Sequence, residues 1–327
     1  MKGRIDSMRH FFNPRAIWLS GLTVVAAFAG IAVAADSAVT VQDANRREVR
    51  ITDSSRIISI GGSVTEILYA LGLEDRIIAV DTSSVYPPQA LKEKPNVGYM
   101  RQLSPEGVLG LGPSLVLATD GAGPKQAMTV LETASVPLVL IPDRFTGESI
   151  VERIRLIAAA TGMTARGECL AKKVESEFAR VADLRKTVQK PLRVVFVLTL
   201  TNGKPMVAGQ NTAADGVIKL AGGQNVFSDF EGYKAVSDEA IVSAQPDIVL
   251  SIRRGDTQLT SEEIFAHPAF SLTPAAKSRN HISMDSLYLL GFGPRTGRAI
   301  GDLAGKLYPS LANTNVAENS GSADCRE

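Results

Sequence analysis

The chain has 327 residues, 45% of them hydrophobic, and its formal net charge at pH 7 is +1. This length and apolar content suffice for two domains of ordinary size. A net charge this small gives no overall field that would favour a nucleic-acid partner. The two cysteines, Cys169 and Cys325, lie far apart in the sequence, and their spacing predicts neither a metal site nor a disulfide framework.

The first 34 residues have the features of a secretory signal. A basic segment precedes an apolar run from residue 16 to residue 34, and Ala32-Val33-Ala34 is a small-x-small cleavage site. An apolar run of this length is also compatible with an uncleaved membrane anchor. Its alanine and glycine content and the cleavage site favour a signal peptide over residues 1–34, cleaved near Ala34. Either Met1 or Met8 is the start.

The next part of the chain predicts an α/β lobe over residues 35–162. A hairpin-like segment reaches about Asp53, and short β-branched strands then alternate with helices, which predicts a parallel sheet with right-handed crossovers. The expected strands are 56–60, 76–80, 115–118 and 137–141, and the expected helices are 64–71, 105–111 and 125–133.

Residues 147–189 have no strand pattern and show apolar residues at helical spacing. They predict a short helix and then a long one, and the long helix is expected to link the lobes over residues 163–190. A second α/β lobe is expected over residues 191–311, with strands 193–199, 248–251 and 281–284 and helices 213–221 and 296–307. Residues 312–327 are polar and predict a disordered tail.

The two halves contain an internal repeat. Ser104, Glu106 and Pro113 in the first half recur at identical spacing as Ser237, Glu239 and Pro246 in the second. Each unit reads as a serine N-cap, a carboxylate in the first helical turn, a short helix and a buried strand. One such carboxylate is explained by the helix dipole alone. A matched pair favours docking onto a partner with two-fold symmetry.

A second repeated pair is Gly98-Tyr99 in the first half and Gly232-Tyr233 in the second. Several sequence motifs resemble those of one known family, and together they cover nearly all of the mature chain. They are 60–72 (IGGSVTEILYALG), 97–104 (VGYMRQLS), 205–209 (PMVAG), 212–215 (TAAD) and 290–295 (LGFGPR). The chain resembles the periplasmic haem-binding proteins of ABC haem importers, in the superfamily of the vitamin B12- and siderophore-binding proteins.

The resemblance implies two Rossmann-like lobes joined by a single long α-helix, with the ligand in the cleft between them and little hinge motion. It implies a location in the periplasm and transfer of haem b to an ABC permease and its ATPase. It also implies that Glu106 and Glu239 dock onto arginines of that permease. Glu66 has no clear counterpart in the second half, and we expect it to be structural.

The resemblance assigns Tyr99 as the axial ligand of the haem iron, with Arg101 supporting it. Ferric iron prefers an anionic oxygen, and tyrosinate is a known haem ligand. Free tyrosine ionises only near pH ~10, so coordination and a nearby guanidinium must stabilise the phenolate. In an extended segment, Arg101 lies on the same side as Tyr99. Without the resemblance, a surface tyrosine in a loop would be the simpler interpretation.

Three further residues are expected to support the haem pocket. Tyr233 lies across the cleft and is the alternative ligand, although ring packing or a hydrogen bond is expected of it. Arg253 and Arg254 follow a strand, where ligands of α/β folds bind, and the family pattern favours Arg254. Arg295 could meet a haem propionate or simply lie at a helix start.

Some relatives with a histidine in the second lobe hold two stacked haems. Residues 198–203 contain no histidine here, so we expect one haem with five-coordinate iron. His267 and His281 are expected to be structural.

Other functions remain as alternatives. A siderophore or cobalamin is the alternative ligand within the superfamily. An enzyme is not expected, because no Ser-His-Asp or Cys-His arrangement stands out and the chain has few histidines. We expect a monomer that receives haem from an outer-membrane receptor and binds no nucleic acid.

Overall fold

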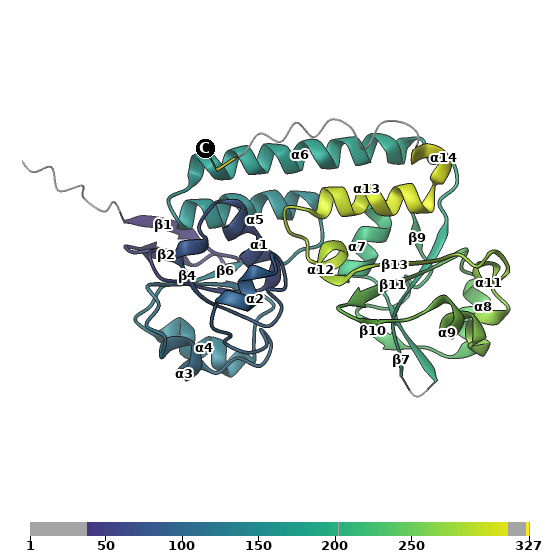
Figure 1. Ribbon diagram of the computed structural model, residues 1–327, viewed down its shortest axis with the longest axis horizontal. Coiled ribbons are helices and arrows are strands. Elements are labelled where there is room, and N and C mark those ends of the chain that lie inside the picture. The colour runs from purple at the N-terminus through teal and green to yellow at the C-terminus, as the bar shows by residue number, and fades with distance from the viewer. Residues whose placement is uncertain (1–37, 202, 313–324, 327) are drawn as a thin grey trace, which may run out of the picture. The chain divides into compact units, whose positions relative to one another are not determined.

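The computed structural model describes residues 38–201, 203–312, 325 and 326. Within them, two α/β lobes are joined by a long helix (Figure 1). This confirms the fold class expected from the alternation of strands and helices. The predicted signal peptide, residues 1–34, lies outside the described residues.

The first lobe is built on a four-stranded parallel sheet in the order β4-β3-β5-β6. Its central strands are buried along their whole length, which explains their uninterrupted apolar sequences. The strands are β3 (Ile57–Ile60), β4 (Ile77–Val80), β5 (Leu115–Thr119) and β6 (Leu138–Ile141). The helical segments are α1 (Gly62–Ala70), η1 (Glu74–Arg76), α2 (Gln89–Glu93), α3 (Pro105–Leu109), α4 (Lys125–Thr133) and α5 (Gly147–Ala160).

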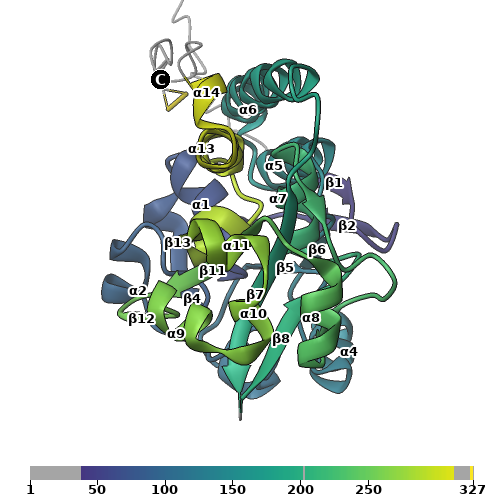
Figure 2. The same cartoon turned by 90° about the vertical axis from the view of Figure 1, so that its right-hand side faces the viewer.

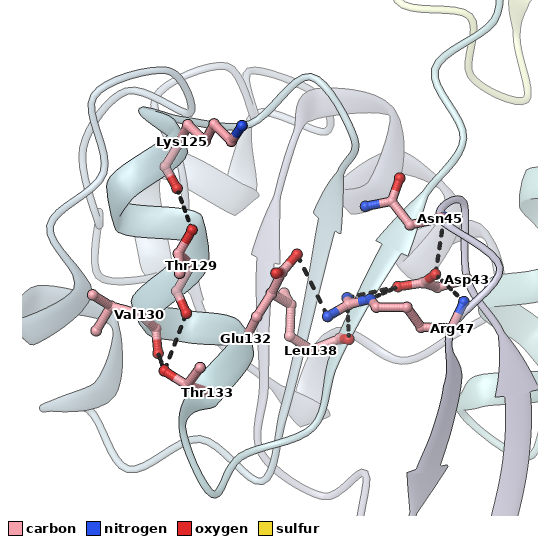
Figure 3. Close-up of polar contacts among 9 residues, drawn as sticks. All are labelled: Asp43, Asn45, Arg47, Lys125, Thr129, Val130, Glu132, Thr133 and Leu138. Atoms are coloured by element: carbon pink, nitrogen blue, oxygen red, sulfur yellow. Dashed lines mark hydrogen bonds and ion pairs between the residues drawn. The ribbon is translucent and has the colours of Figure 1, made fainter.

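A hairpin of β1 (Val39–Gln42) and β2 (Glu48–Ile51) precedes this sheet, as the sequence predicted. Figure 3 shows how its turn is attached to the lobe. The Asp43 carboxylate accepts hydrogen bonds from the backbone N–H groups of Asn45 and Arg47 and from the Arg47 guanidinium. The same guanidinium pairs with Glu132 of α4 at 3.4 Å, so one arginine joins the turn to the sheet's covering helix.

The second lobe contains a seven-stranded mixed sheet in the order β10-β8-β7-β11-β12, with β13 beside β11 and β9 beside β7. Strands β9, β7, β11 and β13 are parallel, whereas β8, β10 and β12 add antiparallel neighbours. The strands are β7 (Arg193–Thr201), β8 (Lys204–Ala208), β9 (Gln224–Asn225), β10 (Tyr233–Ala235), β11 (Ile248–Arg254), β12 (Thr257–Gln258) and β13 (His281–Asp285).

The helices of the second lobe include the two that the sequence predicted at 213–221 and 296–307. Figure 2 shows them with the sheet. They are α7 (Ala213–Leu220), α8 (Asp238–Ala244), α9 (Ser261–Ala266), α10 (Pro268–Ser271), α11 (Pro274–Ser278), α12 (Ser286–Leu290), α13 (Thr296–Leu307) and α14 (Pro309–Ala312). The β7–β8 hairpin was missed by the sequence analysis. The Asn202-Gly203 pair in the sequence is the hairpin signal that could have revealed it.

The linking segment is one short helix, α5, and one long helix, α6 (Thr164–Lys186), as expected. Helix α13 lies along α6 in both views (Figures 1 and 2). The approach is close because residue 297 is a glycine: a Cβ there would lie 2.7 Å from Cβ of Glu177. Arg298 of α13 pairs with the same glutamate at 3.0 Å, so the linking helix is fixed to the second lobe by both packing and charge.

Residues 291–295 of the second lobe contribute to the contact between the lobes, as do Leu287 of α12 beside Gly62 and Gly216 of α7 beside Phe145. Arg153 of α5 is 1% exposed and donates hydrogen bonds to Ser63 Oγ (3.0 Å) and to the carbonyl oxygen of Phe292 (2.8 Å). The Phe292 ring packs on Phe145, with centroids 5.2 Å apart. Buried side chains from both lobes form one continuous apolar cluster around this contact, which gives the lobes a shared core.

The expectation of no disulfide was wrong. Cys169 of α6 is bonded to Cys325, across 156 residues of sequence. Next to it, the Arg326 guanidinium donates a hydrogen bond to the carbonyl oxygen of Tyr69 at 2.9 Å. Sequence distance conceals this pairing because only the fold brings Cys325 to the start of α6. Residues 325 and 326 of the predicted tail are held by these two bonds, and residues 313–324 and 327 lie outside the described part.

Within the described residues, no helix is both long and apolar enough to cross a membrane.

We expect the disulfide to stabilise the fold substantially. Closing a loop of 156 residues restricts the unfolded chain, and the loop-entropy relation gives about 5 kcal/mol for it. Reduction with dithiothreitol should lower the free energy of unfolding in guanidinium by an amount of this order. The Cys169→Ser/Cys325→Ser variant should match the reduced protein and show no further response to the reductant. Equal stability of the oxidised and reduced proteins would contradict the expectation.

Candidate ligand-binding site

Tyr99 lies on an exposed loop that is held firmly at its base. The loop pairs with the end of β4 through hydrogen bonds from Val97 N–H to Val80 O and from Thr82 N–H to Gly98 O, both 2.9 Å. Gly98 has φ +93°, a conformation that favours glycine, and it turns the chain outward. The side chain of Tyr99 is consequently 42% exposed.

Arg101 is directed at this tyrosine. Its Nη1 donates a hydrogen bond to the Tyr99 hydroxyl oxygen at 3.4 Å. The two residues lie two positions apart in a turn closed by a hydrogen bond from Gln102 N–H to Tyr99 O. The structure therefore contains an exposed phenol with a guanidinium on its oxygen.

Tyr233 begins β10 in the second lobe, and its surroundings differ from those of Tyr99. Its ring packs edge-on against Phe196, with centroids 6.3 Å apart. Tyr233 is 37% exposed, nearly as much as Tyr99, but burial of its phenol raises its pKa. The polar groups of Thr212 and Ala214 and the charges of Arg254 and Arg101 oppose the increase in pKa. Its phenol therefore lies at the N-terminus of α7 and stays neutral at pH 7.

The structure brings four of the predicted site residues together. The charges of Arg101 in the first lobe and Arg254 in the second both act on the Tyr233 phenol. Arg101 is also bonded to Tyr99, so the Tyr99–Arg101 pair of the first lobe lies within electrostatic range of Tyr233 in the second. Arg254 lies at the end of β11, where α/β sheets bind ligands. These two phenols and two guanidinium groups form the candidate ligand site.

Arg295 is not placed with this group. Its guanidinium makes a two-pronged bond to the Glu66 carboxylate, at 2.9 Å for each oxygen. It also lies 3.4 Å above the Tyr86 ring centroid. Burial lowers the pKa of Arg295, but the hydrogen bonds and charge of Glu66 outweigh this and raise it overall. Arg295 therefore joins the lobes.

Glu106 and Glu239 occupy matching positions in the two lobes. Each is fully exposed in the first turn of a short helix, α3 or α8, behind a serine N-cap. Hydrogen bonding to the glutamate's own backbone N–H lowers the pKa of each carboxyl group, and the serine hydroxyl lowers it further. Both carboxylates are therefore ionised, preoriented and accessible.

The two histidines outside the leader support local structure. His267 Nδ1 accepts a hydrogen bond from Ala269 N–H and caps α10. His281 bonds Ser251 Oγ at 2.8 Å and Ser261 Oγ at 3.0 Å, and burial lowers its pKa.

The sequence analysis missed two residues that shape this region. Thr212 caps α7 and influences the pKa of Tyr233, and the TAAD string of residues 212–215 was the available signal. Tyr86, under Arg295, lies in a loop with no distinguishing pattern in the sequence.

Most of the chain matches the sequence model of a known protein family. The sequence model of the periplasmic binding protein family matches residues 57–288. The match covers more than half of the chain, and the protein belongs to this family.

Two solved structures and one further relative are similar to this chain over most of its length. The periplasmic haem-binding protein RhuT from Roseiflexus sp. RS-1, in its apo form, is 39% identical with a TM-score of 0.74, over 79% of this chain and 100% of that chain. The periplasmic haem-binding protein BhuT in complex with two haems is 37% identical with a TM-score of 0.75, over 80% and 100%. A vitamin B12-binding protein from Vibrio parahaemolyticus is 29% identical over 75% of this chain and 86% of its own length.

Replacing Glu66 should weaken the junction of the lobes. Glu66 is 5% exposed, and Glu66→Gln removes the charge that Arg295 faces. Loss of one partner of a largely buried pair should lower the free energy of unfolding by about 2 kcal/mol. Glu48→Gln, at an exposed glutamate of β2, is the matched control and should change it by less than about 0.5 kcal/mol. Equal effects of the two substitutions in urea denaturation would show that the pair contributes nothing.

Proposed function

We propose that the protein binds one haem in the cleft between its lobes and delivers it to an ABC permease. The main support for this proposal is the pair Tyr99–Arg101, an exposed phenol that accepts a hydrogen bond from a guanidinium. A phenolate is a hard, anionic ligand that suits ferric iron. The guanidinium stabilises its negative charge, and haem, as cargo, supplies the iron.

The opposite tyrosine has a different part in this proposal. Tyr233 is packed against Phe196, and burial raises its pKa, so its phenol is better suited to contact the haem than to ligate iron. Arg254, whose charge reaches Tyr233, is suited to a propionate or to the tyrosinate. The similarity to two solved haem-binding proteins at 37% and 39% identity supports haem as the ligand. Arg295 supports the site indirectly by holding the lobes together.

Cobalamin is the second candidate, because a vitamin B12-binding protein is among the relatives. Cobalamin carries its own cobalt ligands and has no need of a tyrosinate. The Tyr99–Arg101 pair therefore favours haem.

Tyr99→Phe removes only the hydroxyl group and should abolish the tyrosinate spectrum of the ferric haem complex. Loss of a metal–ligand bond should weaken hemin binding by at least about tenfold. Visible spectroscopy during titration of the purified mature protein with hemin measures both effects.

Tyr233→Phe is the matched control, since it removes the same group from the opposite tyrosine. It should keep the tyrosinate spectrum. The reverse result, with the spectrum lost only in Tyr233→Phe, would make Tyr233 the ligand. If the unaltered protein shows no saturable hemin binding, the haem proposal fails and cobalamin is tested next.

The symmetric carboxylates are proposed to dock the permease. Glu106→Gln/Glu239→Gln should reduce haem uptake by the cognate importer in proteoliposomes by about tenfold or more, because two charged contacts are lost. Binding of hemin to the isolated protein should not change. Glu148→Gln, at another exposed carboxylate in the first turn of a helix, is the control. Uptake equal to that of the control would rule out docking through this pair.

A further inference from the structure

A cavity lies where α1, α6 and the start of α13 meet residues 325 and 326. Its volume is about 400 Å³, within the range of sites for small organic molecules. Tyr99, Arg101, Tyr233 and Arg254 are all absent from its lining. It is therefore separate from the proposed haem site.

The wall of this cavity is partly apolar and partly cationic. Leu170, Val174 and Pro294 supply apolar surface. Four cationic side chains line it as well, namely Lys173, Arg295, Arg298 and Arg326. Glu66 is the one acidic residue among the lining residues.

The three arginines are already balanced by carboxylates. Arg295 pairs with Glu66 at 2.9 Å, Arg298 with Glu177 at 3.0 Å, and Arg326 with Glu74 at 3.6 Å. Lys173 differs from them, because no residue in the described part of the chain pairs with it. It is half-buried on α6. Among the described residues, the cavity wall therefore carries one positive charge that is not paired with a carboxylate.

Tyr69 supplies a second unsatisfied group. Its side chain lines the cavity and is 9% exposed, and its buried hydroxyl has no hydrogen-bond partner among the described residues. Burial raises the pKa of Tyr69, and the charges of Glu93 and Glu74 add to the effect, so the hydroxyl is a neutral donor. A buried donor without a partner is destabilising, and a ligand oxygen would relieve that cost.

We propose that this cavity binds a small organic carboxylate with an apolar body. The carboxylate would bind the Lys173 ammonium and the Tyr69 hydroxyl, and the body would lie against Leu170, Val174 and Pro294. A single uncompensated cation suits a monocarboxylate better than a phosphate, which carries more charge than the wall can balance. Such a ligand would contact the first lobe, the linking helix and the segment that precedes α13.

The test titrates the mature, haem-free protein, with its disulfide intact, with 4-phenylbutyrate in a calorimeter. The neutral analogue 4-phenylbutanol has the same apolar body and tests whether the charge matters. We expect saturable binding of the carboxylate and binding of the alcohol that is weaker by about tenfold, the usual effect of losing a charged hydrogen bond. Equal affinity for the two, or no heat of binding at millimolar concentration, overturns the proposal.

Variants locate the binding groups. Lys173→Met and Tyr69→Phe should each weaken phenylbutyrate binding, the first by about tenfold and the second by about threefold. Lys172→Met, at the exposed neighbouring lysine outside the cavity lining, is the matched control and should bind as the unaltered protein does. Melting curves confirm that all three variants are folded. An equal loss in Lys172→Met would mean that the carboxylate binds the surface of α6.

A final titration uses the protein after addition of hemin. The affinity for phenylbutyrate should not change, because the cavity and the proposed haem site share no lining residue. Loss of phenylbutyrate binding would show that the cavity is part of the haem site. The first titration uses haem-free protein, so it decides the proposal even if haem binding fails.

Discussion

The buried guanidinium of Arg153 is the contact on which the arrangement of the lobes depends. A charge that is 1% exposed must have its hydrogen bonds satisfied, and Arg153 obtains them from Pro142 O, Ser63 Oγ, Asp143 and the carbonyl oxygen of Phe292. The first three partners follow strand ends of the first lobe, and the last belongs to the second. Separating the lobes would take the Phe292 carbonyl away from this buried guanidinium, so this bond opposes opening.

The neighbouring contacts also oppose separation of the lobes. Glu66 and Arg295 add a charged bond between the lobes, and Phe145 packs on the ring of Phe292. A shared apolar cluster surrounds both. The proposed ligand site, formed by side chains from both lobes, is consequently preorganised, and little free energy would be needed to bring Tyr99 and Tyr233 to a common ligand.

The two tyrosines show how one sequence pattern acquires two environments. Gly98 and Gly232 both have positive φ and place a tyrosine next in the chain. Tyr99 follows on an exposed loop with a guanidinium on its oxygen. Tyr233 instead enters a strand and packs on Phe196. The difference comes from neighbours that are distant in sequence, which a local repeat cannot encode.

Local chemistry in the sequence determined the elements of this protein. Buried β-branched runs predicted the strands of the first lobe, and Ser104 and Ser237 predicted the capped helices that carry Glu106 and Glu239. Tyr99 and Arg101 are two residues apart, so their contact was also accessible from the sequence. Only the tertiary structure decided the rest: the Cys169–Cys325 disulfide, the ion pair of Arg295 with Glu66, and the electrostatic effect of Arg101 on Tyr233. Each of these joins residues more than a hundred positions apart, and the fold rather than any local propensity brings such residues together.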